Sequence, residues 1–160
     1  LNNEYEAVFR LNDGKLYQPQ LVQEIRKFDK NGNYKSTFLA SVKNGTIDLN
    51  PTYVESIKQG FFGAVNNEKG TAHQAFLGWP NTISVGGKTG TAEVQGKQDT
   101  SLFIGFSPVD NPTFVCVSIV EQAWFGASTA APIVRRTLEG AYALPISNTG
   151  YVTVDAGGSR

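Results

Sequence analysis

The most informative segment of the chain is Gly86-Gly87-Lys88-Thr89-Gly90-Thr91-Ala92-Glu93, which lies within a strand-like stretch over residues 83–94. Two further strand-like stretches follow closely, at residues 101–106 and 113–120. The residues between them, 108–112, include two prolines, and such a sequence is typical of a turn. The pattern predicts three consecutive antiparallel strands, of which the last two form a hairpin.

Helical patterns lie on both sides of these strands in the sequence. Asn50-Pro51 indicates a helix start, because asparagine caps a first turn and proline has no N–H to leave unpaired there. Apolar residues at helical spacing continue this helix to about Asn66. A later helix is expected from Ala131 until Pro145 ends it, and an earlier one over residues 4–11. The sequence therefore predicts the α+β class, with an antiparallel sheet flanked by helices.

A hairpin is expected between the first two helices. Residues 21–28 and 34–42 alternate roughly as strands do, and Asn31-Gly32 between them is a strong hairpin-turn sequence. We expect one domain over residues 1–143. Residues 144–160 show little periodicity, and we expect them to form a flexible tail.

Composition excludes several classes of function. Lys plus Arg number 14 and Asp plus Glu number 14, so the chain lacks the basic excess that nucleic-acid-binding domains usually show. The longest apolar stretch, residues 114–120, is far shorter than the ~20 residues that a membrane-spanning helix needs. Within that stretch Cys116 has no electropositive neighbour, so we expect a buried small hydrophobic residue rather than a nucleophile. We predict a globular segment that contacts neither nucleic acid nor membrane.

Gly87-Lys88-Thr89 admits three interpretations. It matches the end of the phosphate-binding pattern G-x-x-x-x-G-K-[ST], but the first glycine of that pattern would fall on Thr82. The residues after Thr91 also favour a strand, so no helix N-terminus would face a phosphate, and we exclude this interpretation. The second is the Lys-Thr-Gly element of serine β-lactamases and penicillin-binding proteins. The third is a glycine-rich strand with an exposed lysine and no chemical role.

The chemistry of a Lys-Thr-Gly element suits a strand that borders a cleft. Lys88 supplies a positive charge for a substrate carboxylate, and Thr89 and Thr91 add hydroxyl donors. The glycines allow a ligand or another backbone to approach closely. A free backbone N–H on such a strand can form half of an oxyanion hole. Because side chains alternate along a strand, Lys88 and Thr89 should point to opposite faces, so the strand must twist or lie at a cleft edge to bring both to one site.

The wider sequence resembles class B penicillin-binding proteins from about residue 5 to residue 142. Ala92-Glu93 after the second threonine favours class B over the bifunctional class A enzymes. The other segments that carry the resemblance are, in order, Asn12-Asp13-Gly14-Lys15-Leu16-Tyr17-Gln18-Pro19, Gly70-Thr71-Ala72, residues 101–108, Asp110-Asn111-Pro112 and residues 130–135.

The resemblance implies a fold, a reaction and a set of site residues. The fold is an antiparallel five-stranded sheet packed between helices, whose last three strands and last helix are those predicted above. The reaction is acyl transfer by a serine D,D-transpeptidase that cross-links peptidoglycan stem peptides and binds β-lactams outside the cytoplasm, with no cofactor and no metal. Lys88 would orient the substrate carboxylate and join the proton network. Thr89, Gly90 and Thr91 would bind substrate, and the N–H of Thr91 would be an oxyanion-hole donor.

The chain departs from the family in its nucleophile. No serine is followed by a lysine at the third position, and Ser84 precedes Lys88 by four residues, which is the wrong spacing. No Ser-x-Asn occurs either. In the family both elements precede the Lys-Thr-Gly strand. We therefore expect a truncated, cleaved or split protein that is unable to acylate by itself, whose partner is the missing N-terminal part of the domain and whose membrane anchor is a segment absent here.

Two alternatives to a transpeptidase stay open. One is a related D,D-carboxypeptidase or β-lactam sensor, and the other is a non-catalytic domain that only binds partners. Among residues outside the motif, His73 has no Asp or Cys at ligand spacing, so we expect a surface or loop histidine near the cleft and not a metal ligand. We also expect Glu93 at the rim of the site, Trp79 in a loop, Trp124-Phe125 partly buried against the last helix, and Arg135 and Arg136 as solvated charges.

Overall fold

The computed structural model describes residues 14–123 and 125–147. The helix expected at residues 4–11, the residue Trp124 and most of the expected tail lie outside the described residues. The chain forms two compact units, one up to Asn50 and one from Pro51 onward. The domain boundary at residue 143 stays a prediction. No helix in the described ranges has the length and apolar character needed to cross a membrane.

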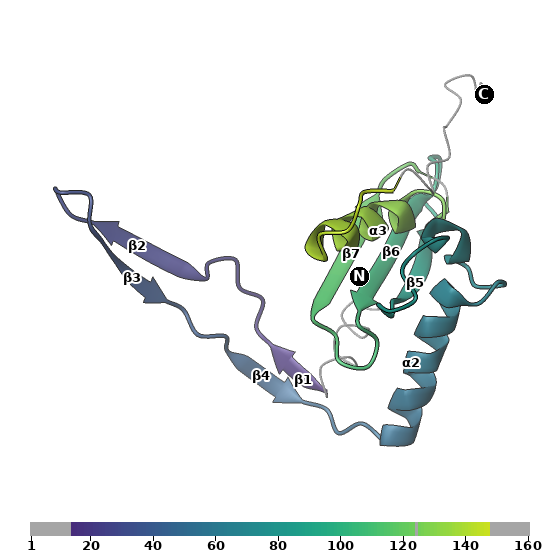
Figure 1. Ribbon diagram of the computed structural model, residues 1–160, viewed down its shortest axis with the longest axis horizontal. Coiled ribbons are helices and arrows are strands. Elements are labelled where there is room, and N and C mark those ends of the chain that lie inside the picture. The colour runs from purple at the N-terminus through teal and green to yellow at the C-terminus, as the bar shows by residue number, and fades with distance from the viewer. Residues whose placement is uncertain (1–13, 124, 148–160) are drawn as a thin grey trace. The chain divides into compact units, whose positions relative to one another are not determined.

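The unit from Pro51 onward is built on an antiparallel sheet (Figure 1). Its strands are β5 (Gly86–Ala92), β6 (Thr100–Ser107) and β7 (Phe114–Val120), paired in the order β5-β6-β7. This confirms the three predicted strands and the hairpin of the last two. Within the described residues this sheet has three strands, not the five that the family resemblance implies.

Two helices pack against this sheet. α3 (Ala130–Ala141) lies across β6 and β7, and α2 (Pro51–Asn66) lies beside β5 (Figure 1). α2 has the predicted bounds, and α3 starts within one residue of the predicted start but ends before Pro145. A short 3₁₀ helix, η1 (His73–Phe76), follows α2 where the sequence suggested only a loop.

The helices cover opposite faces of the sheet. Residues that pair across antiparallel strands share a face, so Thr89 of β5 shares a face with Phe103 of β6. Phe103 belongs to the buried core together with Val134 of α3, so this is the face that α3 covers. On the other face, Phe106 meets Phe61 of α2 edge to face, with ring centroids 5.5 Å apart.

The main core lies between the sheet, α3 and η1. Gly105 lets α3 approach, because a Cβ at this position would lie 2.7 Å from Cγ1 of Val134. Cys116 packs against this core while staying partly exposed, which agrees with a small hydrophobic residue although burial is incomplete. The buried members of the core are Val65, Ala72, Ala75, Phe76, Val85, Phe103, Ala130, Ala131, Val134 and Leu138.

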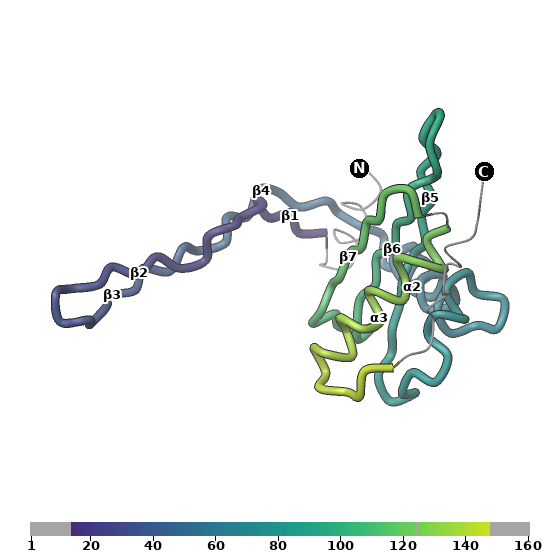
Figure 2. The backbone as a smooth tube through the Cα atoms, turned by 90° about the horizontal axis from the view of Figure 1, so that it is seen from above, coloured from purple at the N-terminus to yellow at the C-terminus, as the bar shows by residue number. Residues whose placement is uncertain are grey.

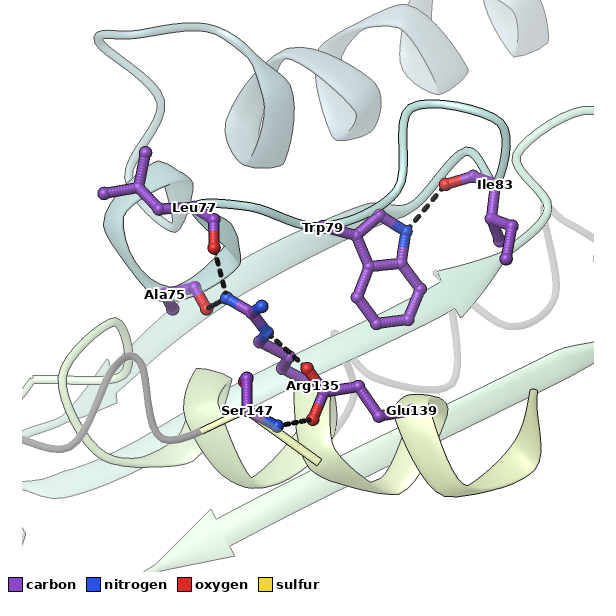
Figure 3. Close-up of polar contacts among 7 residues, drawn as sticks. All are labelled: Ala75, Leu77, Trp79, Ile83, Arg135, Glu139 and Ser147. Carbon is purple, nitrogen blue, oxygen red and sulfur yellow. Dashed lines mark hydrogen bonds and ion pairs between the residues drawn. The ribbon is translucent and has the colours of Figure 1, made fainter. Parts of the chain in front are cut away.

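Arg135 is 3% exposed, so the expectation of a solvated charge is wrong. Its Nε donates to Oε1 of Glu139 at 2.8 Å. Its Nη1 donates to the carbonyls of Ala75 and Leu77 at 2.9 and 2.8 Å (Figure 3). Oε2 of Glu139 in turn accepts the backbone N–H of Ser147 at 2.9 Å. The arginine is satisfied by carbonyls about 60 positions earlier in the chain, and no local pattern reveals such partners.

The same contacts set the ionisation of Glu139, which is 2% exposed. Burial by itself raises the pKa of Glu139, but the N–H of Ser147 and the guanidinium of Arg135 outweigh burial and hold the pKa below its ordinary value. Arg136, the next residue of α3, is half-buried, so it too is less solvated than expected.

The unit up to Asn50 is an antiparallel ribbon. One ladder joins β2 (Glu24–Phe28) to β3 (Tyr34–Phe38), and the other joins β1 (Lys15–Tyr17) to β4 (Lys43–Thr46). Figure 2 shows the two sides of the ribbon winding around each other. The β2–β3 hairpin confirms the prediction, with shorter strands. β1 and β4 were not predicted, because each is at most four residues long and neither shows a clear alternation.

No residue from 15 to 50 is buried, so the ribbon has no apolar core. Local polar contacts link its side chains instead. Oδ1 of Asp29 accepts the N–H groups of Asn31 and Asn33 across the turn, at 2.8 and 2.9 Å. A hydrogen bond from the Asn33 side chain is the main reason that the pKa of Asp29 lies below its ordinary value. Arg26 bonds Glu24 at 2.7–2.8 Å and lies 5.0 Å over the ring of Tyr34.

Candidate functional site

The motif occupies β5, which is an edge strand of the described sheet. Its first two glycines are required by packing. A Cβ on Gly86 would lie 2.6 Å from the ring of Phe106, and a Cβ on Gly87 would lie 2.4 Å from the ring of Phe103. The strand therefore lies directly on the aromatic core, which fixes its position rigidly before the motif reaches the exposed Lys88.

Lys88 and Thr89 leave the strand on opposite faces, as the alternation predicted. Lys88 pairs with Ile104 across the ladder, and Thr89 pairs with Phe103. The ammonium of Lys88 nevertheless returns to the backbone, where its Nζ donates to the carbonyl of Thr89. The lysine side chain thus curls back to the strand, so its charge lies beside Thr89 although the two side chains start on different faces.

Among the described residues, the backbone of β5 pairs with a strand on one side only, so its other edge is open. A Cβ built on Gly126 would lie within 3.1 Å of three backbone atoms, the N and O of Gly90 and the O of Leu102. These atoms therefore lie close to one another, and because Gly90 pairs with Leu102 we infer that the backbone groups of Gly90 face β6. Backbone groups alternate sides along a strand, so those of Thr89 and Thr91 face away from β6. The open edge therefore carries the N–H of Thr91 next to the ammonium of Lys88.

A second hydroxyl reaches the motif from the segment after α2. Oγ1 of Thr89 donates to Oγ1 of Thr71 at 3.1 Å. Thr71 is held by its neighbours, because Ala72 donates its N–H to the carbonyl of Ala64 at 2.8 Å and Gly70 lies against the end of α2. A Cβ on Gly70 would lie 2.4 Å from the carbonyl oxygen of Gly63, so only glycine fits there. The sequence offered Gly70-Thr71-Ala72 as part of a resemblance but gave no role for the hydroxyl.

The segment between β7 and α3 lies over the same face as Thr89 and Thr91. Ser101 pairs with Thr91 in the ladder, and its Oγ donates to the carbonyl of Phe125 at 3.0 Å and accepts the N–H of Ala130 at 3.1 Å. Ser101 is fully buried and both of its hydrogen-bonding functions are used, so it is not a free nucleophile. Its role is to tie this segment to the sheet beside the motif.

The other residues singled out in the sequence lie around the strand in different states. His73 starts η1 and is half-buried, and its Nδ1 has no hydrogen-bond partner among the residues that the structure describes. Glu93 is exposed just past the end of β5. Trp79 is half-buried and donates its Nε1–H to the carbonyl of Ile83 at 2.7 Å (Figure 3). Phe125 is 64% exposed, so its expected burial against the last helix is wrong.

The arrangement presents one positive charge and several hydrogen-bond donors. It combines one ammonium, two facing threonine hydroxyls and a strand edge that pairs with no other described strand. Donors of these kinds bind carboxylates and developing oxyanions. Within the described ranges, no group of three or more His, Cys, Asp or Glu side chains is placed to hold a metal ion.

Known proteins match this chain over nearly all of the described residues. The family model described as "Penicillin binding protein transpeptidase domain" matches residues 9–139. The peptidoglycan D,D-transpeptidase MrdA of Haemophilus influenzae is 28% identical in an alignment of 149 residues, which covers 81% of this chain and 21% of that protein. A peptidoglycan D,D-transpeptidase FtsI homolog of Mesostigma viride is 32% identical in an alignment of 81 residues, which covers 44% of this chain and 13% of that protein. The chain thus spans about a fifth or less of the length of these relatives.

Solved structures agree in fold. The D,D-transpeptidase domain of a peptidoglycan glycosyltransferase from Eggerthella lenta is 28% identical with a TM-score of 0.62, over 84% of this chain and 30% of that chain. Penicillin-binding protein A of M. tuberculosis, in an imipenem acyl-enzyme complex, is 23% identical with a TM-score of 0.66, over 88% of this chain and 30% of that one. The expected α+β fold and the expected class B resemblance are both confirmed. The chain belongs to the family of penicillin-binding protein transpeptidase domains.

Proposed function

We propose that this chain forms the substrate-binding wall of a serine D,D-transpeptidase site that cross-links peptidoglycan stem peptides. The observation that carries the proposal is the edge strand β5, where the ammonium of Lys88 lies beside Thr89 and the N–H of Thr91 faces away from the sheet. The family match and the D,D-transpeptidase relatives support it. The site would act outside the cytoplasm, where peptidoglycan is cross-linked.

Each residue of the motif has a part in the proposed chemistry. Lys88 holds the carboxylate of the stem peptide by charge and joins the proton network of the nucleophile. Thr91 donates a hydroxyl hydrogen bond to the same carboxylate, and Gly90 leaves room for the substrate backbone. The Thr89 hydroxyl donates to Thr71 in this structure; when substrate binds, it turns its hydrogen to the carboxylate and accepts a hydrogen bond from Thr71 instead. The N–H of Thr91 donates to the oxyanion that forms when the D-Ala-D-Ala peptide bond is attacked.

The nucleophile of this reaction comes from outside residues 1–160. The attacking serine forms an ester with the penultimate D-alanine and expels the terminal D-alanine, and an amine of a neighbouring stem peptide then displaces the serine. No serine here has a lysine at the third following position, so we propose that this chain is not acylated by itself. β-Lactams would occupy the same wall, as the imipenem complex of the M. tuberculosis relative suggests.

The proposal is tested by equilibrium binding, which needs no nucleophile. Diacetyl-L-Lys-D-Ala-D-Ala should shift the amide NMR signals of residues 88–91, and Lys88→Ala should weaken binding roughly tenfold or more, since a charge-assisted hydrogen bond contributes about 1.5–3 kcal/mol. Lys97→Ala is the matched control, because Lys97 is an exposed lysine in the loop after β5. Equal losses in the two variants would contradict a specific role for Lys88.

Fluorescent penicillin separates the remaining possibilities. The isolated chain should show no covalent label, and labelling of it would overturn the assignment of the nucleophile to another segment. When the chain is combined with a segment that carries Ser-x-x-Lys, labelling should appear. Absence of labelling in that mixture favours a non-catalytic binding domain, and release of D-alanine without cross-linking favours a carboxypeptidase.

A further inference from the structure

The loop that presents Thr71 to the motif is held from two sides. On one side Ala72 and Gly70 attach it to the end of α2. On the other side η1 continues directly from the loop, with His73 donating its N–H to the carbonyl of Gly70 at 3.1 Å. The position of Thr71 therefore depends on where η1 lies.

The position of η1 depends in turn on α3. Nη1 of Arg135 donates to the carbonyls of Ala75 and Leu77, which lie at the end of η1 (Figure 3). The guanidinium is held at the correct place by Glu139, whose second oxygen is occupied by Ser147. A planar guanidinium can serve all these acceptors at once, whereas a lysine ammonium at the same position cannot span them.

A buried ion pair such as Arg135–Glu139 is a costly way to stabilise a fold. Burying an ion pair requires removing both charges from water, and apolar side chains of similar volume often stabilise a fold as well or better. Arg135 and Glu139 are both almost completely buried within an otherwise apolar core. What an apolar pair could not provide is a donor for the two carbonyls of η1.

We propose that Arg135 and Glu139 are positioning residues that hold η1, and through η1 keep Thr71 within hydrogen-bonding distance of Thr89. In this arrangement α3 sets the orientation of the Thr89 hydroxyl through two side chains that are themselves buried. This inference rests on the proposed function only for its effect on ligand affinity. Its effect on the Thr71–Thr89 contact is independent of what the strand binds.

The decisive variant replaces the pair by apolar residues, Arg135→Met with Glu139→Leu. It removes no volume from the core, so the fold should survive, but the carbonyls of Ala75 and Leu77 lose their donor. We expect faster amide exchange at Ala72 and His73, and altered methyl NMR signals of Thr71 and Thr89. Binding of diacetyl-L-Lys-D-Ala-D-Ala should weaken about threefold to tenfold, as for the loss of one hydrogen bond.

The control is Leu138→Ala, which creates a cavity under the same helix but removes no hydrogen bond to η1. It should lower the denaturation midpoint while leaving the Thr71 and Thr89 signals and the ligand affinity of the folded protein unchanged. Arg135→Lys keeps the charge and should give intermediate changes in the Thr71 and Thr89 signals. If the double variant does not fold, the Thr71 and Thr89 signals of Arg135→Lys test the positioning role in its place.

The outcomes distinguish the two proposals. If the folded double variant keeps the wild-type Thr71 and Thr89 signals, the positioning role is wrong, whatever the affinity. If the wild-type chain binds no D-Ala-D-Ala ligand, the proposed function fails, and the methyl signals and amide exchange still test the positioning role.

Discussion

Both units of the chain are built from antiparallel strands, but only the strands of the second unit bury side chains in a core. In the ribbon up to Asn50, no residue from 15 to 50 is buried and the contacts are local: a capped turn, an ion pair two residues apart and one stacked arginine. In the unit from Pro51 onward, helices cover both faces of the sheet and bury Phe103 and Phe106 almost completely. Two strands alone are marginally stable in water, so the ribbon is held by its turn and the sheet by its core.

The difference explains where the candidate site lies. A site that must hold an ammonium, hydroxyls and an N–H in fixed positions needs rigid support beneath it. β5 has that support, because its glycines lie on the rings of Phe103 and Phe106. The ribbon exposes several large apolar side chains but offers no packed layer on which to orient polar groups.

The largest expected effect is the loss of a core ring. Phe103→Ala should lower the free energy of unfolding by about 3–5 kcal/mol, since Phe103 is 1% exposed and its removal leaves a cavity. Phe38→Ala in the ribbon, where the ring is 70% exposed, should stay within about 0.5 kcal/mol of wild type. Urea denaturation followed by circular dichroism measures both. Similar losses of unfolding free energy in the two variants would show that the ribbon and the core unfold together in one transition.

The second effect is the pH dependence of the Arg135–Glu139 pair. Glu139→Gln should cost about 1.5–3 kcal/mol at pH 7, because a charge-assisted hydrogen bond is lost and Arg135 stays buried. The pKa of Glu139 is lowered by folding, so its contribution is fully present above its ordinary pKa of 4.5 and is lost as the pH falls through the lower value of the folded state.

The measurement is the difference in unfolding free energy between wild type and Glu139→Gln from pH 7 to pH 2.5. Comparing the two proteins isolates Glu139 from the other carboxylates. The difference should shrink steadily below pH 4.5. A difference that stays constant over this range would mean that folding does not change the pKa of Glu139.

The third effect concerns the crossing of the β7–α3 segment over β5. A Cβ on Gly126 would lie 2.2 Å from the carbonyl oxygen of Leu102 and 2.5 Å from that of Gly90. Gly126→Ala should therefore cost about 1–3 kcal/mol and increase amide exchange at Gly90. Gly140→Ala in α3 is the matched control, because a Cβ there meets nothing within 4 Å and alanine favours the helix. Equal behaviour of the two variants would exclude the close crossing.

The smallest effect on global stability belongs to the turn of the ribbon. Asp29→Ala removes the acceptor for Asn31 and Asn33, so amide protection over β2 and β3 should fall. The unfolding midpoint of the unit from Pro51 onward should not change, because the buried residues of its core come from positions 65–138 and not from the ribbon. Hydrogen exchange by NMR resolves the two units residue by residue. A shift in the core midpoint would show that the units are energetically coupled.

Several elements followed from local sequence alone. Asn50-Pro51 and the apolar spacing behind it predicted α2, and Asn31-Gly32 predicted the β2–β3 hairpin. β5, β6 and β7 were predicted because their residues are strand formers separated by turn sequences. β1, β4 and η1 were missed, since elements of three or four residues carry too short a pattern to stand out from a loop.

The sequence also located the motif and its alternation, with Lys88 and Thr89 on opposite faces. It could not give the return of the lysine ammonium to the Thr89 carbonyl, the approach of Thr71 or the burial of Arg135. Each of these joins groups whose relation is set by three-dimensional packing and not by spacing along the chain. Side-chain type and periodicity determine which strand carries the chemistry. The partners of each polar group are decided only by the tertiary structure, because helices and strands that pack around a core bury donors, and each buried donor needs an acceptor.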